Sequence, residues 1–257
     1  MPSKGIRLAL ALLLALALAG VAIWSLLPLR QVERQPLGLV TSLPIYWADG
    51  ADIATIIGDD AELPWQRQLL EERYHLVPLD SLAPSSSTVG DQPASAPLSQ
   101  IDRLLIAQPR GLSPADNVAL DDWVHGGGHL LYILDPMLTG DYAAPLGDPR
   151  NPVFAAMIPP VFKRWGLSVQ FDERQPLEPV EVETGAGTIP VMMAGQLLQL
   201  QSDDESCRLE GEGILAECRI GKGKVTVLAD AFLLESPDRD VEGSGDALDA
   251  LTVRAFE

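Results

Sequence analysis

Two aspartates that directly follow strand-like segments are the residues of this chain best placed to do chemistry. Asp135 follows the continuously apolar segment His129–Leu134, and Asp230 follows Val225–Ala229. If both segments are parallel strands of an α/β sheet, the two carboxylates lie at its carboxyl edge, where open sheets of this kind bind ligands. They could bind a cation or a polar ligand there, or act in a metal-assisted hydrolysis. The alternative, which we favour, is that each carboxylate accepts hydrogen bonds from nearby backbone N–H groups.

A third segment is expected to end at the same edge. The apolar run Leu37–Leu43 predicts a buried strand that ends before Pro44, and the loop after it contains Tyr46 and Trp47. These two aromatic side chains could contact a partner or a ligand, and they could equally belong to the core. Ser42 lies near the end of the predicted strand, next to this loop. The candidate ligand-binding residues are therefore Ser42, Tyr46, Trp47, Asp135 and Asp230.

Other motifs of the sequence do not have the spacing of a nucleophile, metal or phosphate site. There is neither a Gly-x-Ser-x-Gly elbow nor a cysteine in the corresponding setting, so nucleophilic catalysis is not expected. Asp121 and His125 lie four residues apart on a predicted helix, where a polar helix end is the better interpretation than a metal site. Gly126–Gly128 lies at the carboxyl end of that helix, whose dipole repels phosphate, and Gly221–Lys224 predicts a hairpin turn because it lacks the Walker spacing. We therefore predict no catalytic residue, no metal and no cofactor.

The two cysteines, Cys207 and Cys218, flank a segment with the alternation of an antiparallel hairpin. If Glu212-Gly213 is a two-residue turn, Cys207 lies directly opposite Cys218, at a Cα separation of about 4.5–5.5 Å that permits a disulfide. The alternative is a pair of buried thiols that pack as small apolar groups. A disulfide is the expectation if the domain lies outside the cytoplasm.

The amino-terminal segment Leu8–Leu27 contains 20 consecutive uncharged residues, nearly all of them apolar. As a helix it would be roughly 30 Å long, which matches the hydrocarbon thickness of a bilayer. We interpret it as an uncleaved anchor, with cleavage as a signal peptide after Ala19 as the alternative. Lys4 and Arg7 favour a cytoplasmic amino terminus. The prediction is a single-pass protein of the inner (cytoplasmic) membrane, with its soluble domain outside the cytoplasm.

The composition and charge exclude several classes of protein. The chain has 257 residues, of which 47% are hydrophobic, and this excludes a wholly disordered chain, a collagen and a multi-span membrane protein. Its formal net charge is −18, with 18 basic and 36 acidic side chains. Such a surface repels phosphates, so nucleic acid is not an expected partner. The same balance argues against a domain that lies flat on anionic lipid.

The periodicity of the remaining chain predicts one α/β domain over residues 37–257, after an anchor at 1–30 and a linker at 31–36. Further helices and strands are expected, in chain order, over Pro64–Tyr74, His75–Leu79, Ile101–Ala107, Ser113–His125, Asn151–Trp165, Gly166–Phe171 and Asp246–Phe256. A polar, proline-containing segment at 80–100 predicts a flexible loop. Alternating segments at 178–220 predict a β-rich insertion that includes the cysteine hairpin.

Three segments carry a recognisable combination of motifs. They are Leu104-Leu-Ile-Ala-Gln-Pro with Leu112-Ser-Pro and Leu120-Asp-Asp-Trp-Val, then Gly126-Gly-Gly-His-Leu-Leu-Tyr-Ile-Leu-Asp-Pro136, then Gly221-Lys-Gly-Lys-Val-Thr-Val-Leu-Ala-Asp230. Together they resemble the extracytoplasmic domain of gliding-motility-type ABC-transporter auxiliary proteins and related uncharacterised domains. The resemblance implies a flavodoxin-like, class I glutamine-amidotransferase-like α/β fold with a β-hairpin-rich carboxyl-terminal part, preceded by one transmembrane helix. This chain departs from the family in its single apparent span and its short carboxyl end.

The expected function follows from the resemblance and from the lack of a catalytic motif. We expect a non-catalytic, membrane-anchored, extracytoplasmic accessory domain of an ABC-type transport system, with the permease and ATPase subunits as partners. The alternative is a metal-assisted hydrolase that uses Asp135 and Asp230. A third hypothesis is a purely structural partner of another membrane subunit, which would present an apolar patch.

Overall fold

The computed structural model describes residue 5 and residues 34–51, 63–84, 96–145, 147–200, 206–236, 238–239 and 243–257. The chain divides into two units, Met1–Arg34 and Gln35–Glu257, and the description below concerns the second. The predicted anchor Leu8–Leu27 lies outside the described residues, as does the middle of the predicted loop at 80–100. Over the described ranges, no helix has both the length and the apolar character needed to cross a bilayer.

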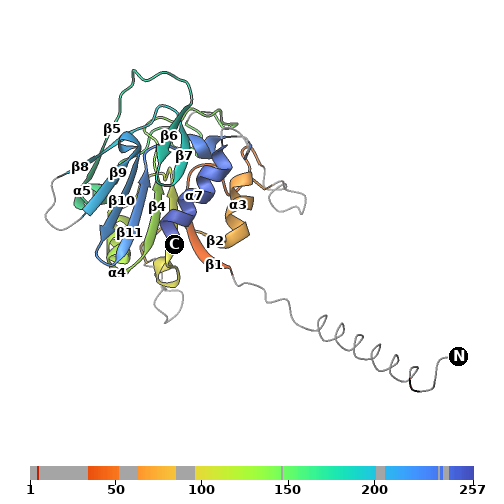
Figure 1. Ribbon diagram of the computed structural model, residues 1–257, viewed down its shortest axis with the longest axis vertical. Helices are drawn as coiled ribbons and strands as arrows, with labels where there is room; N and C mark the ends of the chain where they lie inside the picture. Colours follow the sequence, from red (N-terminus) through yellow and green to blue (C-terminus); the bar gives the residue numbers. More distant parts are fainter. Residues whose placement is uncertain are drawn as a thin grey trace. The chain divides into compact units, whose positions relative to one another are not determined.

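A seven-stranded sheet forms the centre of the domain, with the strand order β2-β1-β3-β4-β11-β10-β9 (Figure 1). The parallel strands are β1 (Gln35–Thr41), β2 (Tyr74–Pro78), β3 (Arg103–Ala107), β4 (His129–Ile133) and β11 (Gly223–Leu228). The antiparallel strands at one side are β10 (Leu215–Ile220) and β9 (Ser206–Glu210). The expectation of a mixed α/β fold with a mostly parallel central sheet is confirmed. The β2-β1-β3-β4 order is that of doubly wound sheets, in which helices cover both faces.

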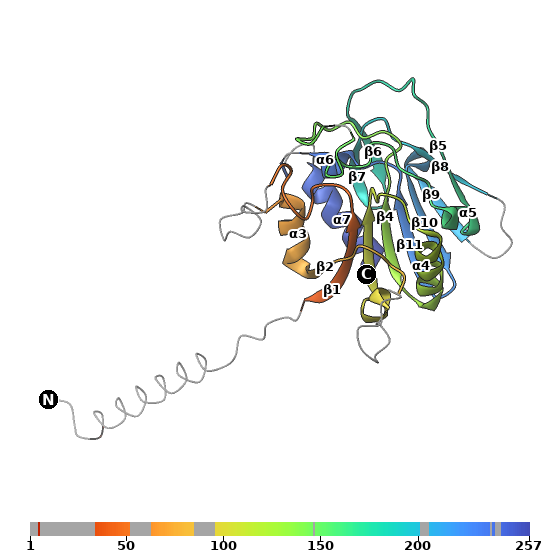
Figure 2. The ribbon, with the colours of Figure 1, turned by 180° about the vertical axis from the view of Figure 1, so that it is seen from behind.

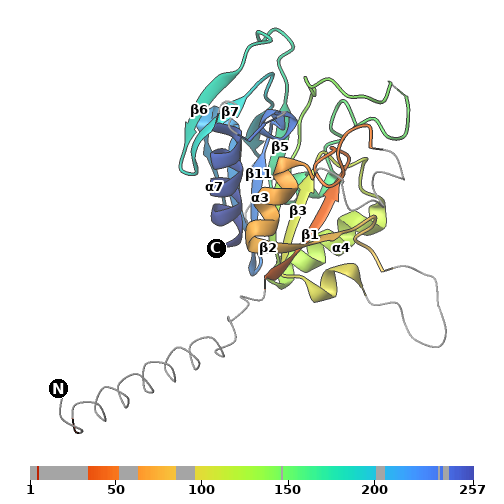
Figure 3. The same cartoon turned by 90° about the vertical axis from the view of Figure 1, so that its right-hand side faces the viewer.

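Helices cover both faces of this sheet, as the strand order requires (Figure 3). On one face lie α3 (Trp65–Arg73), α6 (Phe232–Glu235) and α7 (Ser244–Phe256). On the other face lie α4 (Pro114–Gly126) and α5 (Pro160–Arg164). Each face has its own buried apolar cluster, because successive residues of a buried strand point to opposite sides. Leu105 and Leu131 belong to the first cluster, whereas Leu104 and Leu130 belong to the second.

The start and the end of α4 follow from its sequence. Ser113 and Asp116 form a capping box, in which each side chain accepts a hydrogen bond from the backbone N–H of the other. Asp116 also accepts hydrogen bonds from the backbone N–H groups of Leu82 and Ala83, so the same carboxylate holds the chain that follows β2. The helix ends at Gly127, whose φ of +125° is a conformation that favours glycine.

The prediction of a helix over Asn151–Trp165 is wrong for most of its length, because only Pro160–Arg164 is helical. Two adjacent prolines explain the difference, since proline lacks the N–H of a helix interior and disfavours a helical conformation in the residue before it. The backbone of the preceding segment pairs with the loop after β4 instead. Ala156 donates to the carbonyl of Asp135 over 2.8 Å, and Leu138 donates to that of Phe154 over 2.8 Å.

The described residues of the segment predicted as a β-rich insertion form five strands. β6 (Val180–Thr184) and β7 (Gly187–Val191) form a separate antiparallel pair, and β8 (Gln196–Gln199) pairs with β5 (Leu167–Gln170). The other two strands, β9 and β10, extend the central sheet. The short helix η1 (Pro97–Gln100) leads into β3. The β6–β7 pair and α6 lie at the end of the sheet where the parallel strands finish (Figure 2).

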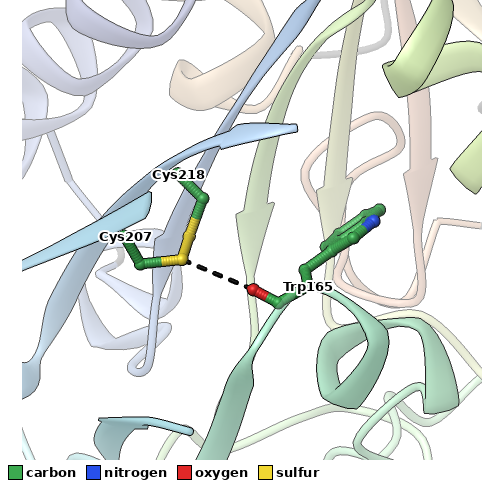
Figure 4. Close-up of a disulfide and its surroundings, with 3 residues drawn as sticks. All are labelled: Trp165, Cys207 and Cys218. Carbon is green, nitrogen blue, oxygen red and sulfur yellow. Dashed lines mark hydrogen bonds between the residues drawn. A yellow bond between two sulfur atoms is a disulfide. The ribbon is translucent and has the colours of Figure 1, made fainter. Parts of the chain in front are cut away.

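The β9–β10 hairpin has the register that its alternation predicts, with Cys207 opposite Cys218. A disulfide joins the two cysteines, and the sulfur of Cys207 lies 3.6 Å from the carbonyl oxygen of Trp165 (Figure 4). The prediction of a two-residue turn at Glu212-Gly213 is wrong. The ladder ends at the pair Glu210–Leu215, and the short helix η2 (Gly211–Gly213) makes a longer connection.

Candidate functional site

Asp135 lies at the carboxyl end of β4 and is fully buried. Both oxygens of its carboxylate accept hydrogen bonds from the surrounding backbone. Its Oδ1 accepts a hydrogen bond from the N–H of Met137 over 2.7 Å, and its Oδ2 accepts one from the N–H of Ala231 over 3.1 Å. The carboxylate therefore joins the loop after β4 to the start of the segment that leads into α6.

Asp230 occupies the equivalent place after β11 and is also fully buried. Its Oδ1 accepts from the N–H of Phe232 over 2.8 Å, and its Oδ2 accepts from the N–H of Met192, which follows β7, over 3.1 Å. Both aspartates thus accept two backbone hydrogen bonds each, which is the arrangement favoured from the sequence.

The charge of Asp135 acts on Asp230, and neither carboxylate forms an ion pair with a described residue. Burial raises the pKa of Asp135, and the nearby Glu235 adds to that effect. Burial also raises the pKa of Asp230 well above its ordinary value, and the charge of Asp135 raises it further. Like charges in a low-dielectric interior favour the protonated form, so this pair holds a proton more readily than free aspartates do.

Gln108, immediately after β3, connects this pair to the rest of the edge. Its side chain accepts from the N–H of Asp135 over 2.8 Å and donates to the carbonyls of Asp135 and Val153 over 3.0 and 2.8 Å. The backbone φ of Gln108 is +45°, a value that residues other than glycine rarely adopt outside strained turns. Ser42, after β1, donates from Oγ to the carbonyl of Gln108 over 2.5 Å and accepts from the N–H of Val153 over 3.1 Å.

Glu235 makes a second set of hydrogen bonds with the loop after β4. Its carboxylate accepts from the backbone N–H groups of Thr139 and Gly140 over 3.0 and 2.8 Å. It also accepts from the hydroxyl of Tyr142 over 2.5 Å. Desolvation by burial, together with this carboxylate, raises the pKa of Tyr142, which is therefore a permanent donor. The loop after β4 is thus held by two carboxylates in succession.

An open pocket of about 660 Å³ lies beside this hydrogen-bonded edge, at the carboxyl ends of β1 and β2. Ser42, Tyr46 and Trp47 belong to its lining, and Ala143 and Arg150 close it from the loop after β4. The sequence-predicted candidates therefore divide into two groups. Ser42, Tyr46 and Trp47 line a pocket, whereas Asp135 and Asp230 lie in the interior.

The aromatic part of this pocket is braced by Arg67 from α3. The guanidinium of Arg67 lies 4.2 Å from the ring centre of Tyr46 and 5.3 Å from that of Trp47. It also donates to the carbonyl of Tyr46 over 3.2 Å and pairs with Glu71. Trp47 keeps 45% of its surface exposed, so it is available for contact, while Tyr46 packs against the core.

The pair Asp121 and His125 has a structural role. Asp121 is buried, accepts from the indole N–H of Trp165 over 2.9 Å and pairs with Arg164 over 2.7 Å. It therefore fixes α5 against α4, and His125 lies 3.2 Å from the same carboxylate. Across the part of the chain that the structure describes, no group of three or more His, Cys, Asp or Glu side chains could hold a metal ion.

No family model and no curated protein matches this chain. Among solved structures, it is similar to the exo-beta-1,4-mannosidase Op5Man5 from Opitutaceae bacterium strain TAV5, with 18% identity over 88% of this chain and a TM-score of 0.44. The chain spans 37% of the length of that enzyme. It is also similar to the cytoplasmic protein STM1381 from Salmonella typhimurium LT2, with 14% identity, 85% and 98% of the two chains covered, and a TM-score of 0.46. A putative ThuA-like protein from Bacteroides uniformis matches at 12% identity, with 87% and 90% covered and a TM-score of 0.41.

Proposed function

We propose that this chain is a non-catalytic binding domain, and that its ligand or partner contacts the pocket formed by the loop after β1. One observation carries the proposal. The polar side chains at the ends of β3, β4 and β11 are buried and hydrogen-bonded to backbone groups, while the neighbouring pocket is open and presents an exposed tryptophan. A catalytic carboxylate must reach its substrate, whereas a binding pocket needs shape and a few polar groups.

The finer fold assignment belongs to the same proposal. A flavodoxin-like, class I glutamine-amidotransferase-like domain is supported by the β2-β1-β3-β4 order followed by β11 as the fifth parallel strand. Such sheets bind ligands outside the carboxyl ends of their strands, and that is the position of the proposed pocket.

We place this domain outside the cytoplasm, anchored in the inner membrane and accessory to an ABC-type transport system. The resemblance of the three motif segments supports the transport setting. The apolar segment Leu8–Leu27 supports the anchor. The disulfide between Cys207 and Cys218 supports an oxidising compartment, because cytoplasmic thiols are kept reduced.

The test is affinity purification of the full-length protein from its native membrane in mild detergent, followed by mass spectrometry. Recovery of an ABC ATPase with its permease is the expected result, and recovery of the protein alone from a well-solubilised membrane contradicts it. The variant Trp47→Ala should reduce recovery of the partners. Phe154→Ala is the matched control, since Phe154 is also an aromatic residue with 45% of its surface exposed and lies outside the pocket.

The alternative, a metal-assisted hydrolase that uses Asp135 and Asp230, has its own test. It requires stoichiometric divalent metal in the purified protein, and loss of that metal in Asp135→Asn. Metal-free protein that still recovers its partners would contradict the hydrolase and agree with the binding function.

A further inference from the structure

The opposite edge of the sheet, where the parallel strands begin, carries a row of basic side chains. Arg103 of β3 is in register with His129 of β4, His129 with Lys224 of β11, and Lys224 with Arg219 of β10. Residues in register on neighbouring strands are about 4.8 Å apart and point to the same face. Four basic residues therefore stand side by side across four strands.

This arrangement is unfavourable unless something compensates it. Like charges directly opposite each other in an antiparallel pair destabilise the sheet, and Arg219 lies directly opposite Lys224. Burial, followed by the charges of Lys224 and Arg103, lowers the pKa of His129. The chain has twice as many acidic as basic side chains, so partners for these cations were abundant.

Part of the row has an internal role. Lys224 donates to the carbonyl oxygen of Arg254 in the last turn of α7, where a cation is favourable. Glu217, 3.9 Å from Lys224, is already bound by Arg254 through two hydrogen bonds. These contacts account for Lys224, but they leave Arg103 and Arg219 without an ion pair within the described ranges.

A pocket of about 540 Å³ opens beside this row. His129, Arg219, Lys222 and Lys224 line it, together with Arg208 and the disulfide. Arg219 and Lys222 are exposed, and neither forms an ion pair with a described residue. The acidic groups that face the pocket are Glu217, which is engaged by Arg254, and Glu257.

The backbone of this pocket is held in place. Gly221 and Lys222 form the turn between β10 and β11, since Ile220 pairs with Gly223. The N–H of Lys222 donates to the carbonyl of His125 over 3.1 Å, and that of Lys224 donates to Gly128 over 3.2 Å. The turn is thus fastened to the end of α4, so the backbone that carries Lys222 is held in place and an anion would not have to order a loop.

We propose that this pocket binds a phosphate group, with Arg219 and Lys222 as its principal contacts. The inference goes beyond the proposed function, because this pocket lies at the opposite end of the strands from the loop after β1. The phosphate could belong to an anionic lipid headgroup or to a soluble phosphate compound. The net charge of the whole chain does not exclude this, because salt screens charges beyond about 8 Å and the local row decides the interaction.

The experiment compares the two sources with the full-length protein in lipid nanodiscs. Hydrogen exchange of segments 125–129 and 219–224 is followed in phosphatidylcholine discs, in the same discs with 20 mM inorganic phosphate, and in discs that contain phosphatidylglycerol. Protection only in phosphatidylglycerol discs assigns a lipid headgroup, and protection by inorganic phosphate assigns a soluble compound. No protection in either arm overturns the proposal.

Two variants separate the site from general electrostatics. Arg219→Gln should lower the affinity for phosphate about tenfold, which corresponds to 1.4 kcal/mol. The phosphate-dependent protection measures this affinity. Arg174→Gln is the matched control, since Arg174 is an exposed arginine away from this pocket that pairs with Asp172. An equal loss in both variants would overturn the assignment, because it would show a dependence on net charge alone.

Discussion

Two pairs of carboxylates on the central sheet have opposite electrostatic environments. At the carboxyl edge, Asp135 and Asp230 are surrounded by backbone N–H groups and burial raises the pKa of both. On β9 and β10, Glu210 and Glu217 are bound by Arg254. Complete burial is the main cause that raises the pKa of the two aspartates, whereas Glu210 and Glu217 are partly exposed and have a guanidinium as partner.

The arginine-bound cluster has the opposite electrostatic signature. Hydrogen bonds from Arg254 hold the pKa of Glu217 below its ordinary value. At Glu210, burial acts to raise the pKa. Hydrogen bonds from the N–H of Gly185 and from Arg254 outweigh burial, so the pKa of Glu210 is also lowered. The two carboxylates also raise the pKa of Arg254, so this cluster stays fully charged. It ties α7 to β9 and β10 through charge, while the aspartate pair ties loops together through hydrogen bonds.

The largest expected effect is that of Asp230→Ala, which removes the acceptor of two backbone N–H groups in a fully buried place. We expect a loss of about 3 kcal/mol in the free energy of unfolding, because buried donors without partners cost about 1–3 kcal/mol each. Urea denaturation of the full-length protein in detergent measures it.

The matched control for Asp230→Ala is Asp172→Ala. Asp172 also accepts from the N–H two residues further on, at 3.0 Å, but it is exposed. Its loss should cost less than about 0.5 kcal/mol, since water replaces the missing acceptor. Equal losses in the two variants would mean that burial does not set the difference.

The second prediction is that the two carboxylate pairs give the stability opposite pH dependences. Burial raises the pKa of Asp135 to about 7, so the folded state binds more protons than the unfolded one between about pH 4 and pH 7. Stability should therefore fall across this range as pH rises, by about 2 kcal/mol between pH 5 and pH 7. The lowered pKa values of Glu210 and Glu217 act below the ordinary glutamate value, where stability should fall as pH falls.

Two variants assign the two limbs of this pH profile. Asp230→Asn should flatten the fall toward pH 7, because it removes a buried carboxyl group whose own pKa is raised by burial and by the charge of Asp135. Glu217→Gln should flatten the fall at acid pH and leave the neutral limb unchanged. A wild-type profile that rises steadily from pH 5 to pH 7 would contradict the raised pKa values.

The third prediction concerns Arg254→Met, which removes the charge and retains a long apolar side chain. Breaking a buried ion pair costs about 3–5 kcal/mol, but these side chains are 13–20% exposed. We therefore expect a smaller loss, of about 1.5 kcal/mol. Addition of Glu217→Gln should recover part of it, because one uncompensated charge is removed. A double variant less stable than Arg254→Met would contradict this explanation.

Much of this arrangement was predictable from the sequence, because it depends on local periodicity. Alternation along β9 and β10 predicts the register that places Cys207 opposite Cys218. The spacing of Ser113 and Asp116 predicts the cap of α4. Apolar segments followed by polar residues predict that Asp135 and Asp230 lie at the same edge of the sheet, and the structure adds that the strands before them, β4 and β11, are neighbours.

The partners of these residues were not predictable, because they come from distant segments. Glu235 reaches the loop after β4 from 95 residues further along the chain, and α6, which carries it, is too short to show periodicity. Gln108 directly follows β3, yet its positive φ has no signature in the residue type. Arg67 contacts Tyr46 across 21 residues. The Asn151–Trp165 prediction failed because apolar spacing was given more weight than the proline pair.

The smallest expected effect is that of Arg208→Met, and it tests whether geometry or charge count matters at the arginine-bound cluster. Arg208 contacts the same two glutamates as Arg254, but its side chain is 68% exposed against 16% for Arg254. Water screens an exposed pair and competes for its hydrogen bonds, so its loss should cost less than about 0.5 kcal/mol. Urea denaturation at low and high salt measures this. A loss as large as that of Arg254→Met would mean that the cluster responds to its total positive charge, and the contrast with the aspartate pair would then rest on net charge and not on buried geometry.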